Sequence, residues 1–200
     1  MSPFVKVCGL STARDVQLAV AHQADAIGFV LTASPRQIDP EQAAALAALV
    51  PESIATVAVF KNEDVPSIIA RATLADVDWV QVHGQRSETE IRELAAAGFE
   101  VIRAIRRDAP DEQFACWGEK FLLVDAAMPG SGEAWDYAAV RERAAARRWL
   151  LAGGLHAGNV ASALADSQAT GADVSSGLES SRGVKDPEKI TAFLAAAKGA

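Results

Sequence analysis

The chain is organised around a short stretch near its amino terminus, Val5-Lys6-Val7-Cys8-Gly9-Leu10. Residues 4–7 form an apolar, β-branched run that is typical of a strand, and a thiol and a glycine follow this run. Ser11 and Thr12 then supply side-chain oxygens of the kind that begin helices. We therefore expect Cys8 at the carboxyl end of a strand, facing a cleft that the ends of later strands share.

The same alternation of strand and helix continues to the end of the chain. Most of the apolar runs are continuous, as in parallel strands that are covered on both faces. They predict strands at residues 4–7, 26–30, 55–60, 79–82, 100–105, 121–124, 149–151 and 172–174. Alanine-rich segments predict helices at about residues 12–23, 40–49, 64–72, 87–97, 110–116, 136–148, 157–165 and 187–197. Three of the helix starts carry capping signals, namely Asp39-Pro40, Ser87 with Glu90, and Asp186-Pro187.

Eight strand–helix units joined by short links predict an α/β fold, a single-domain (β/α)₈ TIM barrel over residues 1–200. The alternative is a doubly wound open sheet. Such a sheet seldom has so many strands, and no Gly-x-Gly-x-x-Gly turn follows the first strand. No low-complexity linker divides the chain, so we expect one catalytic domain.

Composition narrows the classes of function. A chain of 200 residues that is 50% hydrophobic can bury one sizeable core. Its formal net charge of −7 argues against nucleic-acid binding, which needs a basic surface. The first residues lack the pattern of a secretory signal, and no apolar run approaches the ~18–20 residues of a membrane helix. Cys8 and Cys116 lack metal-ligand spacing, so we expect a cytoplasmic protein with reduced thiols, no membrane segment and no metal site.

Working groups in such a barrel lie at the carboxyl ends of the strands and in the loops that follow. This criterion uses strand positions alone, without regard to residue chemistry. It selects Cys8, the loop Ser34-Pro35-Arg36, His83-Gly84, Arg103, Asp125, Gly153-Gly154 and Asp173-Val174-Ser175-Ser176-Gly177.

The strongest chemical signal is the pair of glycine-rich loops after the seventh and eighth predicted strands. Gly153-Gly154 and Ser175-Ser176-Gly177 would offer backbone amides and a hydroxyl to an anion, and a short helix beginning near Leu178 could point its positive end at it. Barrels commonly bind phosphate in these two loops. The glycines could instead only make tight turns, but two such groups at these strands favour a phosphate site.

The other strand-end residues each have a structural alternative. Asp125 follows an apolar strand, where desolvation would raise its pKa and let it donate a proton, or it could cap the loop at residues 130–132. Arg36 could grip a carboxylate through two parallel hydrogen bonds or lie in solvent. Cys8 could be a small buried hydrophobe. His83 could contact a ligand or bond to a neighbouring loop.

An ordered set of motifs resembles the phosphoribosylanthranilate isomerase family of tryptophan biosynthesis over essentially the full length of the chain. Each motif alone is weak, but their order is specific. The motifs are Val5-Lys6-Val7-Cys8-Gly9-Leu10, Gly28-Phe29-Val30 with Ser34-Pro35-Arg36, Val80-Gln81-Val82-His83-Gly84, Leu123-Val124-Asp125-Ala126, Leu151-Ala152-Gly153-Gly154-Leu155 with Asn159-Val160, Asp173-Val174-Ser175-Ser176-Gly177-Leu178-Glu179, and Gly183-Val184-Lys185-Asp186.

The resemblance implies an eight-stranded barrel and an aldose–ketose isomerase. Its reaction would be the Amadori rearrangement of N-(5-phosphoribosyl)anthranilate to 1-(2-carboxyphenylamino)-1-deoxyribulose 5-phosphate, the third step from chorismate to tryptophan. By motif match, Cys8 takes the position of the general base, Asp125 that of the general acid, and Arg36 that of the arginine that receives the anthranilate carboxylate. The two glycine-rich loops match the phosphate loops.

Other expectations concern the substrate and the partners. We expect His83 and Asp173 to contact a small phosphorylated substrate, and we expect a monomer or a homodimer. Neither a metal nor an organic cofactor is required, because the substrate's own nitrogen serves as the electron sink.

The residues fit the chemistry of this reaction. Opening the furanose ring needs a proton on its oxygen, which Asp125 could give. The resulting iminium acidifies the adjacent C2′ proton, which the thiolate of Cys8 could remove. An ordinary thiol, with a pKa of about 8.5, is only slightly ionised at neutral pH, so positive charge from Lys6 or from the iminium should favour the thiolate.

One departure from the family and two rival functions stay open. The loop Met128-Pro129-Gly130-Ser131-Gly132 has a proline where the family usually has paired glycines, which would stiffen it. The aminoaldose isomerase of histidine biosynthesis resembles this architecture, but it uses an aspartate at the position of Cys8. A catalytically silent phosphate sensor would keep the glycine loops, although the presence of both Cys8 and Asp125 disfavours it.

Overall fold

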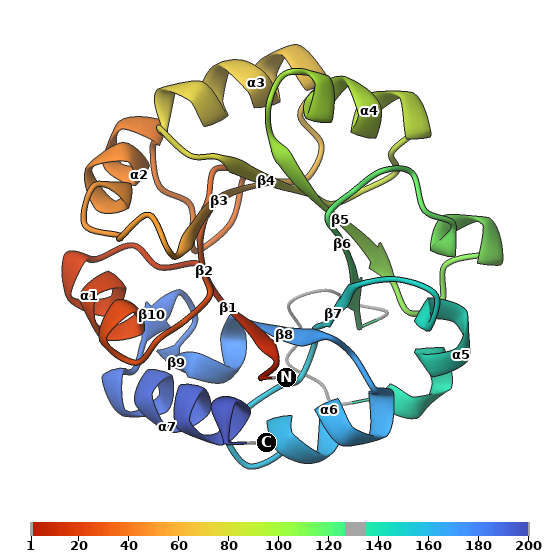
Figure 1. Ribbon diagram of the computed structural model, residues 1–200. Coiled ribbons are helices and arrows are strands. Elements are labelled where there is room, and N and C mark those ends of the chain that lie inside the picture. The colour runs from red at the N-terminus through yellow and green to blue at the C-terminus, as the bar shows by residue number, and fades with distance from the viewer. Residues whose placement is uncertain (1, 127–134, 200) are drawn as a thin grey trace.

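The computed structural model describes residues 2–126 and 135–199 and is a closed eight-stranded barrel surrounded by helices (Figure 1). The strands follow one another around the barrel in chain order, all neighbours are parallel, and the eighth strand pairs with the first. They are β1 (Phe4–Cys8), β2 (Ala26–Val30), β3 (Ala55–Phe60), β4 (Trp79–Val82), β5 (Glu100–Arg106), β6 (Phe121–Asp125), β7 (Trp149–Leu151) and β8 (Gly171–Val174). The predicted barrel is confirmed, and each predicted strand is within one residue of its observed bounds.

Six of the eight predicted helices are also present, as α1 (Ala13–Ala21), α2 (Pro40–Ala47), α3 (Val65–Leu74), α4 (Glu88–Ala96), α6 (Val160–Ser167) and α7 (Pro187–Lys198). Their starts follow the sequence signals. Ser87 and Glu90 form the reciprocal capping box, and the Asp186 carboxylate accepts from the first backbone amides of α7. Asp39 precedes Pro40 as predicted, although its side chain makes no capping hydrogen bond.

The other two predicted helices are wrong. Residues 110–116 contain only a 3₁₀ turn, η1 (Asp111–Phe114), and residues 136–148 contain a second turn, η2 (Tyr137–Val140), followed by the one-turn helix α5 (Arg141–Ala144). A buried ionic cluster takes the place of a packed helix outside β5. Arg103 donates to the Glu119 carboxylate at 2.7 Å and to the carbonyls of Gln113 and Ala115, which a single turn leaves without helical partners.

Arg103 is therefore not at the carboxyl end of its strand, as the sequence criterion assumed. Strand β5 continues to Arg106, so Arg103 lies in its middle. Its neighbours Ile102 and Ala104 belong to the cluster inside the barrel, and side chains alternate across a strand, so Arg103 faces the outer layer.

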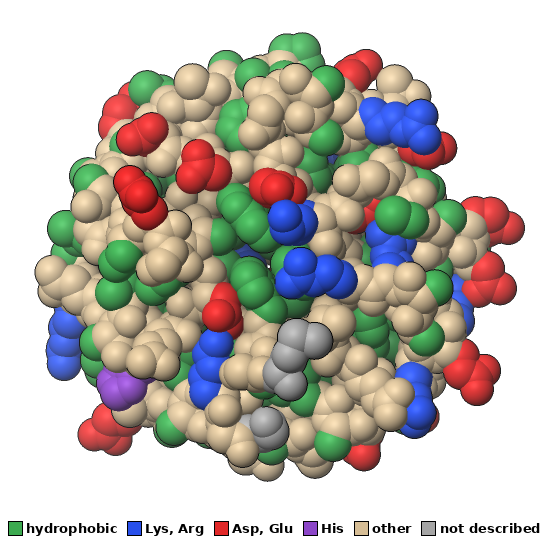
Figure 2. All heavy atoms as spheres, in the orientation of Figure 1, with side chains coloured by type: hydrophobic (Ala, Val, Ile, Leu, Met, Phe, Trp, Pro, Cys, Tyr) green, Lys and Arg blue, Asp and Glu red, His purple; other side chains and the backbone are tan. Residues whose placement is uncertain are grey.

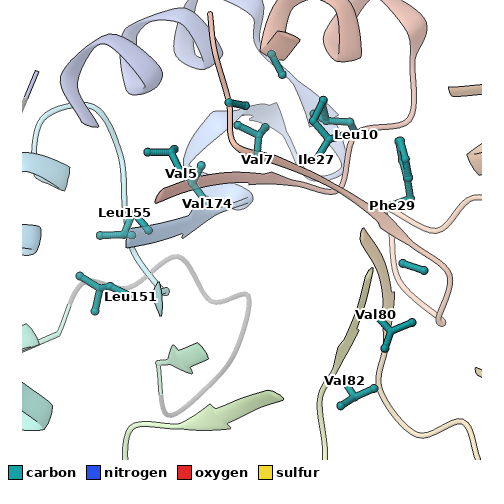
Figure 3. Packing of buried hydrophobic residues seen from close by; sticks show 14 of the residues in the cluster. Val5, Val7, Leu10, Ile27, Phe29, Val80, Val82, Leu151, Leu155 and Val174 are labelled. Carbon is teal, nitrogen blue, oxygen red and sulfur yellow. The ribbon is translucent and has the colours of Figure 1, made fainter. Parts of the chain in front are cut away.

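Hydrophobic side chains fill two concentric layers. The outer layer lies between the strands and the surrounding helices, and Figure 3 shows part of it, including Val5 and Val7 of β1 beside Ile27 of β2. The inner layer fills the barrel with residues such as Leu123 and Leu150. At its amino-terminal end, the rings of Phe4, Trp79 and Phe121 are in mutual contact, with centroids 4.8–6.2 Å apart.

The surface in the orientation of Figure 1 mixes hydrophobic side chains with Lys, Arg, Asp and Glu side chains of both signs (Figure 2). None of the helices within residues 2–126 and 135–199 combines the length and the apolar character that crossing a bilayer requires.

Candidate active site

Strand β1 carries a lysine and a thiol on the face that points into the barrel. Lys6 and Cys8 are two positions apart, so they share one face, and their relative exposures are 0% and 6%. Gly28 of β2 lies beside Cys8 in the strand register. A β-carbon on Gly28 would lie 2.9 Å from the sulfur of Cys8 and 3.1 Å from Nζ of Lys6, so the missing side chain makes the space that both groups occupy.

Lys6 forms a buried ion pair with Asp173 of β8. Its Nζ donates to Oδ1 of Asp173 at 2.9 Å, and both side chains are nearly inaccessible. Burial acts to lower the pKa of Lys6, but the charges of Asp173 and Cys8 outweigh it, so the pKa is raised. Lys6 therefore stays positively charged inside the barrel, next to the thiol.

The thiol is harder to ionise than the sequence analysis assumed. Burial raises the pKa of Cys8, and the charge of Asp173 adds to this effect. Lys6 and the more distant Lys185 act to lower the pKa, as the sequence predicts for Lys6, but they do not overcome burial. The predicted direction of the Lys6 effect is therefore confirmed, but burial outweighs it and the pKa of the free thiol is raised overall.

Asp125 lies at the carboxyl end of β6, on the same mouth of the barrel as Cys8 at the end of β1. Burial raises its pKa to about 6, the Asp173 charge adds to the effect, and the backbone N–H of Ala126 and the charge of Lys6 oppose it. Its Oδ1 accepts from that N–H at 2.8 Å. The alternative role as a cap of residues 130–132 falls on a segment outside the described residues, as does the proline of the loop Met128-Pro129-Gly130-Ser131-Gly132.

His83 follows β4 and faces the same mouth. Its Nε2 lies 2.8 Å from Nε2 of Gln81, a buried residue two positions earlier on the inner face of the strand. Burial, with Lys6, Lys61 and Arg86 adding positive charge, lowers the pKa of His83 to about 4. The imidazole is thus neutral near pH 7, and it can take part in hydrogen bonds to a ligand without adding charge. Gln81 was not predicted, although the period-two pattern of β4 puts it on the face of His83.

The two glycine-rich loops form one small cavity. It is lined by Asp125, Ala152, Gly153, Gly154, Leu155, Asp173, Val174, Ser175, Ser176 and Gly177. Gly153 and Gly154 have φ of +85° and +66°, and a β-carbon on Gly153 would lie 2.9 Å from Oδ1 of Asp125. A β-carbon on Gly177 would lie 1.8 Å from the carbonyl oxygen of Leu155, so the loops after β7 and β8 touch through their backbones. Glycine is therefore required for close approach here, and the same two loops can present bare amides to an anion.

The helix expected to begin near Leu178 is absent. The chain makes the 3₁₀ turn η3 (Ser176–Leu178) and then a small antiparallel hairpin, β9 (Glu179–Ser181) with β10 (Val184–Lys185). This hairpin brings two groups to the site that the sequence analysis did not select. Lys185 donates from Nζ to the carbonyl oxygen of Ser175 at 2.8 Å and to its hydroxyl at 3.2 Å. Glu179 accepts from Arg36.

Arg36 follows β2 and is not the solvated arginine of the alternative interpretation. Its side chain is only 14% exposed. The backbone N–H of Arg36 donates to Oγ of Ser34, and the guanidinium donates to both carboxylate oxygens of Glu179. A β-carbon on Gly9 would lie 2.8 Å from Cδ of Arg36, so the glycine next to Cys8 leaves room for the arginine.

The mouth of the barrel thus brings together most of the residues that the sequence selected. Cys8, Asp125, His83 and Asp173 surround its opening, and the glycine-rich loops adjoin Asp125 and Asp173 on one side. Arg36 lies next to Gly9 on the β1–β2 side. The arrangement offers an acid of raised pKa, a thiol beside a fixed cation, a glycine-lined cavity and a separate guanidinium.

Comparison with known proteins gives one consistent result. Residues 5–196 match the family model described as N-(5'phosphoribosyl)anthranilate (PRA) isomerase. A protein of that name from Paracoccus denitrificans is 38% identical over 210 residues, covering 98% of each chain, and one from Listeria welshimeri is 37% identical over 202 residues with the same coverage.

Solved structures agree in fold. The structure of TrpF from Jonesia denitrificans is 42% identical with a TM-score of 0.86, covering 99% of this chain and 98% of that one. The phosphoribosyl anthranilate isomerase of Thermotoga maritima is 33% identical with a TM-score of 0.89 over all of both chains. A further isomerase structure, 32% identical with a TM-score of 0.85 over all of both chains, is a complex with reduced 1-(o-carboxyphenylamino)-1-deoxyribulose 5-phosphate.

Proposed function

Because the chain belongs to the N-(5'-phosphoribosyl)anthranilate isomerase family and is an isomerase of tryptophan biosynthesis, we propose that Cys8 and Asp125 carry out its Amadori rearrangement as base and acid. The observation that carries this proposal is the position of both groups at one mouth of the barrel, at the ends of β1 and β6. The Lys6–Asp173 ion pair acts on both groups, because its charges shift the pKa values of Cys8 and of Asp125.

Asp125 acts first in the proposed reaction. The pKa of about 6 leaves roughly a tenth of this carboxyl protonated at pH 7, far more than an ordinary aspartic acid. The neutral form donates its proton to the furanose ring oxygen, the C1′–O bond breaks, and the nitrogen lone pair forms the C1′=N iminium. The carboxylate left behind is stabilised by the N–H of Ala126.

Cys8 acts second, when the iminium is present. The raised pKa of the free thiol means that few molecules carry the thiolate, and the positive iminium favours it at the moment when it is needed. The thiolate removes the C2′ proton, and the electron pair moves through C1′ to the nitrogen. The enolamine so formed then tautomerises to the ketose.

The rest of the site holds the two charged ends of the substrate. Gly153, Gly154, Ser175, Ser176 and Gly177 line the cavity that suits the phosphate. Arg36 receives the aromatic carboxylate, and His83 and Asp173 contact the sugar. The separation of these two anion sites fits a substrate with a phosphate at one end and a carboxylate at the other.

We extend the proposal to the protein as a whole. Residues 1–200 would act as one catalytic domain, in the cytoplasm, without a metal, an organic cofactor, a nucleic acid or a membrane. A related isomerase of Thermotoga maritima is described as dimeric, and a monomer or a homodimer is proposed for this chain.

A fluorescence assay that follows the loss of phosphoribosylanthranilate tests the proposed roles. Cys8→Ser and Asp125→Asn should each lower kcat by roughly 10²–10⁴-fold, the usual range for a lost acid or base, with circular dichroism unchanged. Near-normal turnover in either purified variant would reject that residue's role. Turnover of the histidine-pathway aminoaldose instead, or binding without any turnover, would favour the rival isomerase or the sensor.

A further inference from the structure

The guanidinium of Arg36 is held by the carboxylate of Glu179, a residue that has no role in the proposed reaction. Nε of Arg36 donates to Oε1 of Glu179 at 2.5 Å, and NH2 donates to Oε2 at 3.0 Å. Both oxygens of the carboxylate are engaged, and the Glu179 side chain is only 6% exposed. This is the bidentate, charge-assisted geometry that fixes an arginine most firmly.

Glu179 is itself anchored from the other side. It accepts from the backbone N–H of Gly183, in the turn of the β9–β10 hairpin, and from Nζ of Lys185 on β10, both at 3.2 Å. Burial acts to raise the pKa of Glu179, but the bond from Arg36, the Gly183 N–H and the Lys185 charge outweigh it, so the pKa is lowered. The carboxylate is therefore ionised at neutral pH.

The hairpin also packs directly on the loop that carries Arg36. Gly183 has φ of +86°, and a β-carbon there would lie 2.7 Å from the carbonyl oxygen of Pro35, the residue before Arg36. Lys185 links the same hairpin to Ser175 of the phosphate loop. One small hairpin thus touches both proposed anion sites.

The contact leaves part of the guanidinium available. Glu179 occupies the side-on edge, formed by Nε and one hydrogen of NH2. Across residues 2–126 and 135–199, no hydrogen bond is made by NH1 of Arg36. The end-on edge, formed by NH1 and the other hydrogen of NH2, has the fork geometry that matches a second carboxylate.

We propose that Glu179 is a positioning residue that fixes Arg36 through its side-on edge, so that the end-on edge receives the aromatic carboxylate of the substrate. This inference rests on the proposed function, because it assumes that Arg36 is the carboxylate site. A free arginine side chain populates many rotamers, and holding it in place before binding removes that entropic cost from the binding step. The local charge also favours an anionic ligand, because the two cations Arg36 and Lys185 outnumber the one anion, Glu179.

Glu179→Gln tests the inference with little change in volume. The amide cannot accept from both nitrogens of Arg36, so KM for phosphoribosylanthranilate should rise about tenfold, a typical loss for one charge-assisted contact, while kcat changes little. Glu179→Asp keeps the charge but is too short to reach both nitrogens, and it should also raise KM. This second variant keeps the test decisive if Glu179→Gln fails to fold.

The matched control is Glu119→Gln. Glu119 also holds arginines, Arg103 and Arg147, by the same chemistry, but on the outside of the barrel. This control should lower the melting temperature and leave KM unchanged. A KM effect in Glu179→Gln that merely followed lost stability would appear in Glu119→Gln as well, and would overturn the positioning role.

A double-mutant cycle with Arg36→Met separates the inference from the proposed function. If Glu179 acts through Arg36, Glu179→Gln adds no further rise in KM to that of Arg36→Met. Additive effects, or an unchanged or lower KM in Glu179→Gln alone, would overturn the positioning role while leaving Arg36 as the clamp. An unchanged KM in Arg36→Met would instead reject the carboxylate clamp of the proposed function.

Discussion

The same strands build both ends of the barrel interior, one with aromatic side chains and the other with titratable ones. Strands β1, β4 and β6 begin with Phe4, Trp79 and Phe121, whose rings pack together at the amino-terminal end, which we call the floor. Four residues further along, Cys8 and Asp125 end β1 and β6, and His83 directly follows β4, all at the mouth. Because side chains alternate along a strand, this even spacing lets each of the three strands bring an aromatic ring to the floor and a titratable group to the mouth.

The two ends also differ in the sign of their contribution to stability. Aromatic contacts and the burial of apolar area at the floor favour folding. Burial at the mouth raises the pKa of both Cys8 and Asp125, which means that their charged forms are disfavoured in the folded protein. Above about pH 6, an ionised Asp125 at the mouth therefore costs free energy that the floor offsets.

The largest effect should come from emptying the floor. Phe121→Ala should lower the free energy of unfolding by about 3–5 kcal/mol, the usual loss for a buried phenylalanine, because the ring contacts both Phe4 and Trp79. Urea denaturation followed by circular dichroism measures this change. The kcat of the folded fraction should stay near that of the unaltered protein, because no floor residue reaches the mouth.

Phe121→Leu is the control, since it keeps most of the buried volume and should recover most of the lost stability. A large fall in kcat for folded Phe121→Ala would show that the two ends are coupled, and the division between floor and mouth would fail.

The next effect has the opposite sign. Asp125→Asn should stabilise the protein at pH 8 by up to about 3 kcal/mol, because a carboxyl whose pKa rises from 3.8 to about 6 is penalised by roughly two pKa units when ionised. The folded pKa lies above the unfolded one, so the favourable contribution of the neutral carboxyl is complete below about pH 4 and is lost as the pH rises through about 6. The gain from asparagine should therefore fall to about 0.5 kcal/mol at pH 4.

Thermal unfolding at the two pH values measures this difference. The matched control is Asp108→Asn, whose exposed carboxylate pairs with Arg106 at the end of β5 and should change stability little at either pH. Equal stability of Asp125→Asn and the unaltered protein at pH 8 would mean that the mouth imposes no such cost.

The comparison also explains which parts of the fold were predictable from sequence. Continuous apolar runs predict all eight strands because both faces of each strand are buried, and Cys8 and Asp125 follow from their places at strand ends. Among the eight helices predicted between strands, two failed, at residues 110–116 and 136–148. The ionic cluster of Arg103, Glu119 and Arg147 lies outside β5 there. A buried cluster of charged residues leaves no periodic pattern of apolar residues from which it could be predicted. The short helix expected near Leu178 is also absent.

The missed site residues depend on contacts between distant segments. Glu179 lies far along the chain from Arg36, and the hairpin that joins them is too short to leave a strand pattern. The net pKa of Cys8 was also unpredictable, because it depends on how far burial outweighs the charge of Lys6. Sequence identifies the groups at the mouth, whereas their electrostatic balance requires the packed structure.

The smallest effect probes how closely the mouth is packed, at Gly28 of β2. In Gly28→Ala, the new methyl would lie 2.9 Å from the sulfur of Cys8 and 3.1 Å from Nζ of Lys6, so the thiol and the amine must move. A shift of this kind should lower kcat about tenfold, less than the ~10²-fold that a 1 Å misplacement of a reacting group can cost. Ala26→Gly, one step nearer the floor on the same face, should lower stability by about 1 kcal/mol and leave kcat unchanged. If Gly28→Ala kept full turnover in the same steady-state assay, the position of the thiol would not limit the reaction, and the contrast between a packed floor and a finely set mouth would lose its main support.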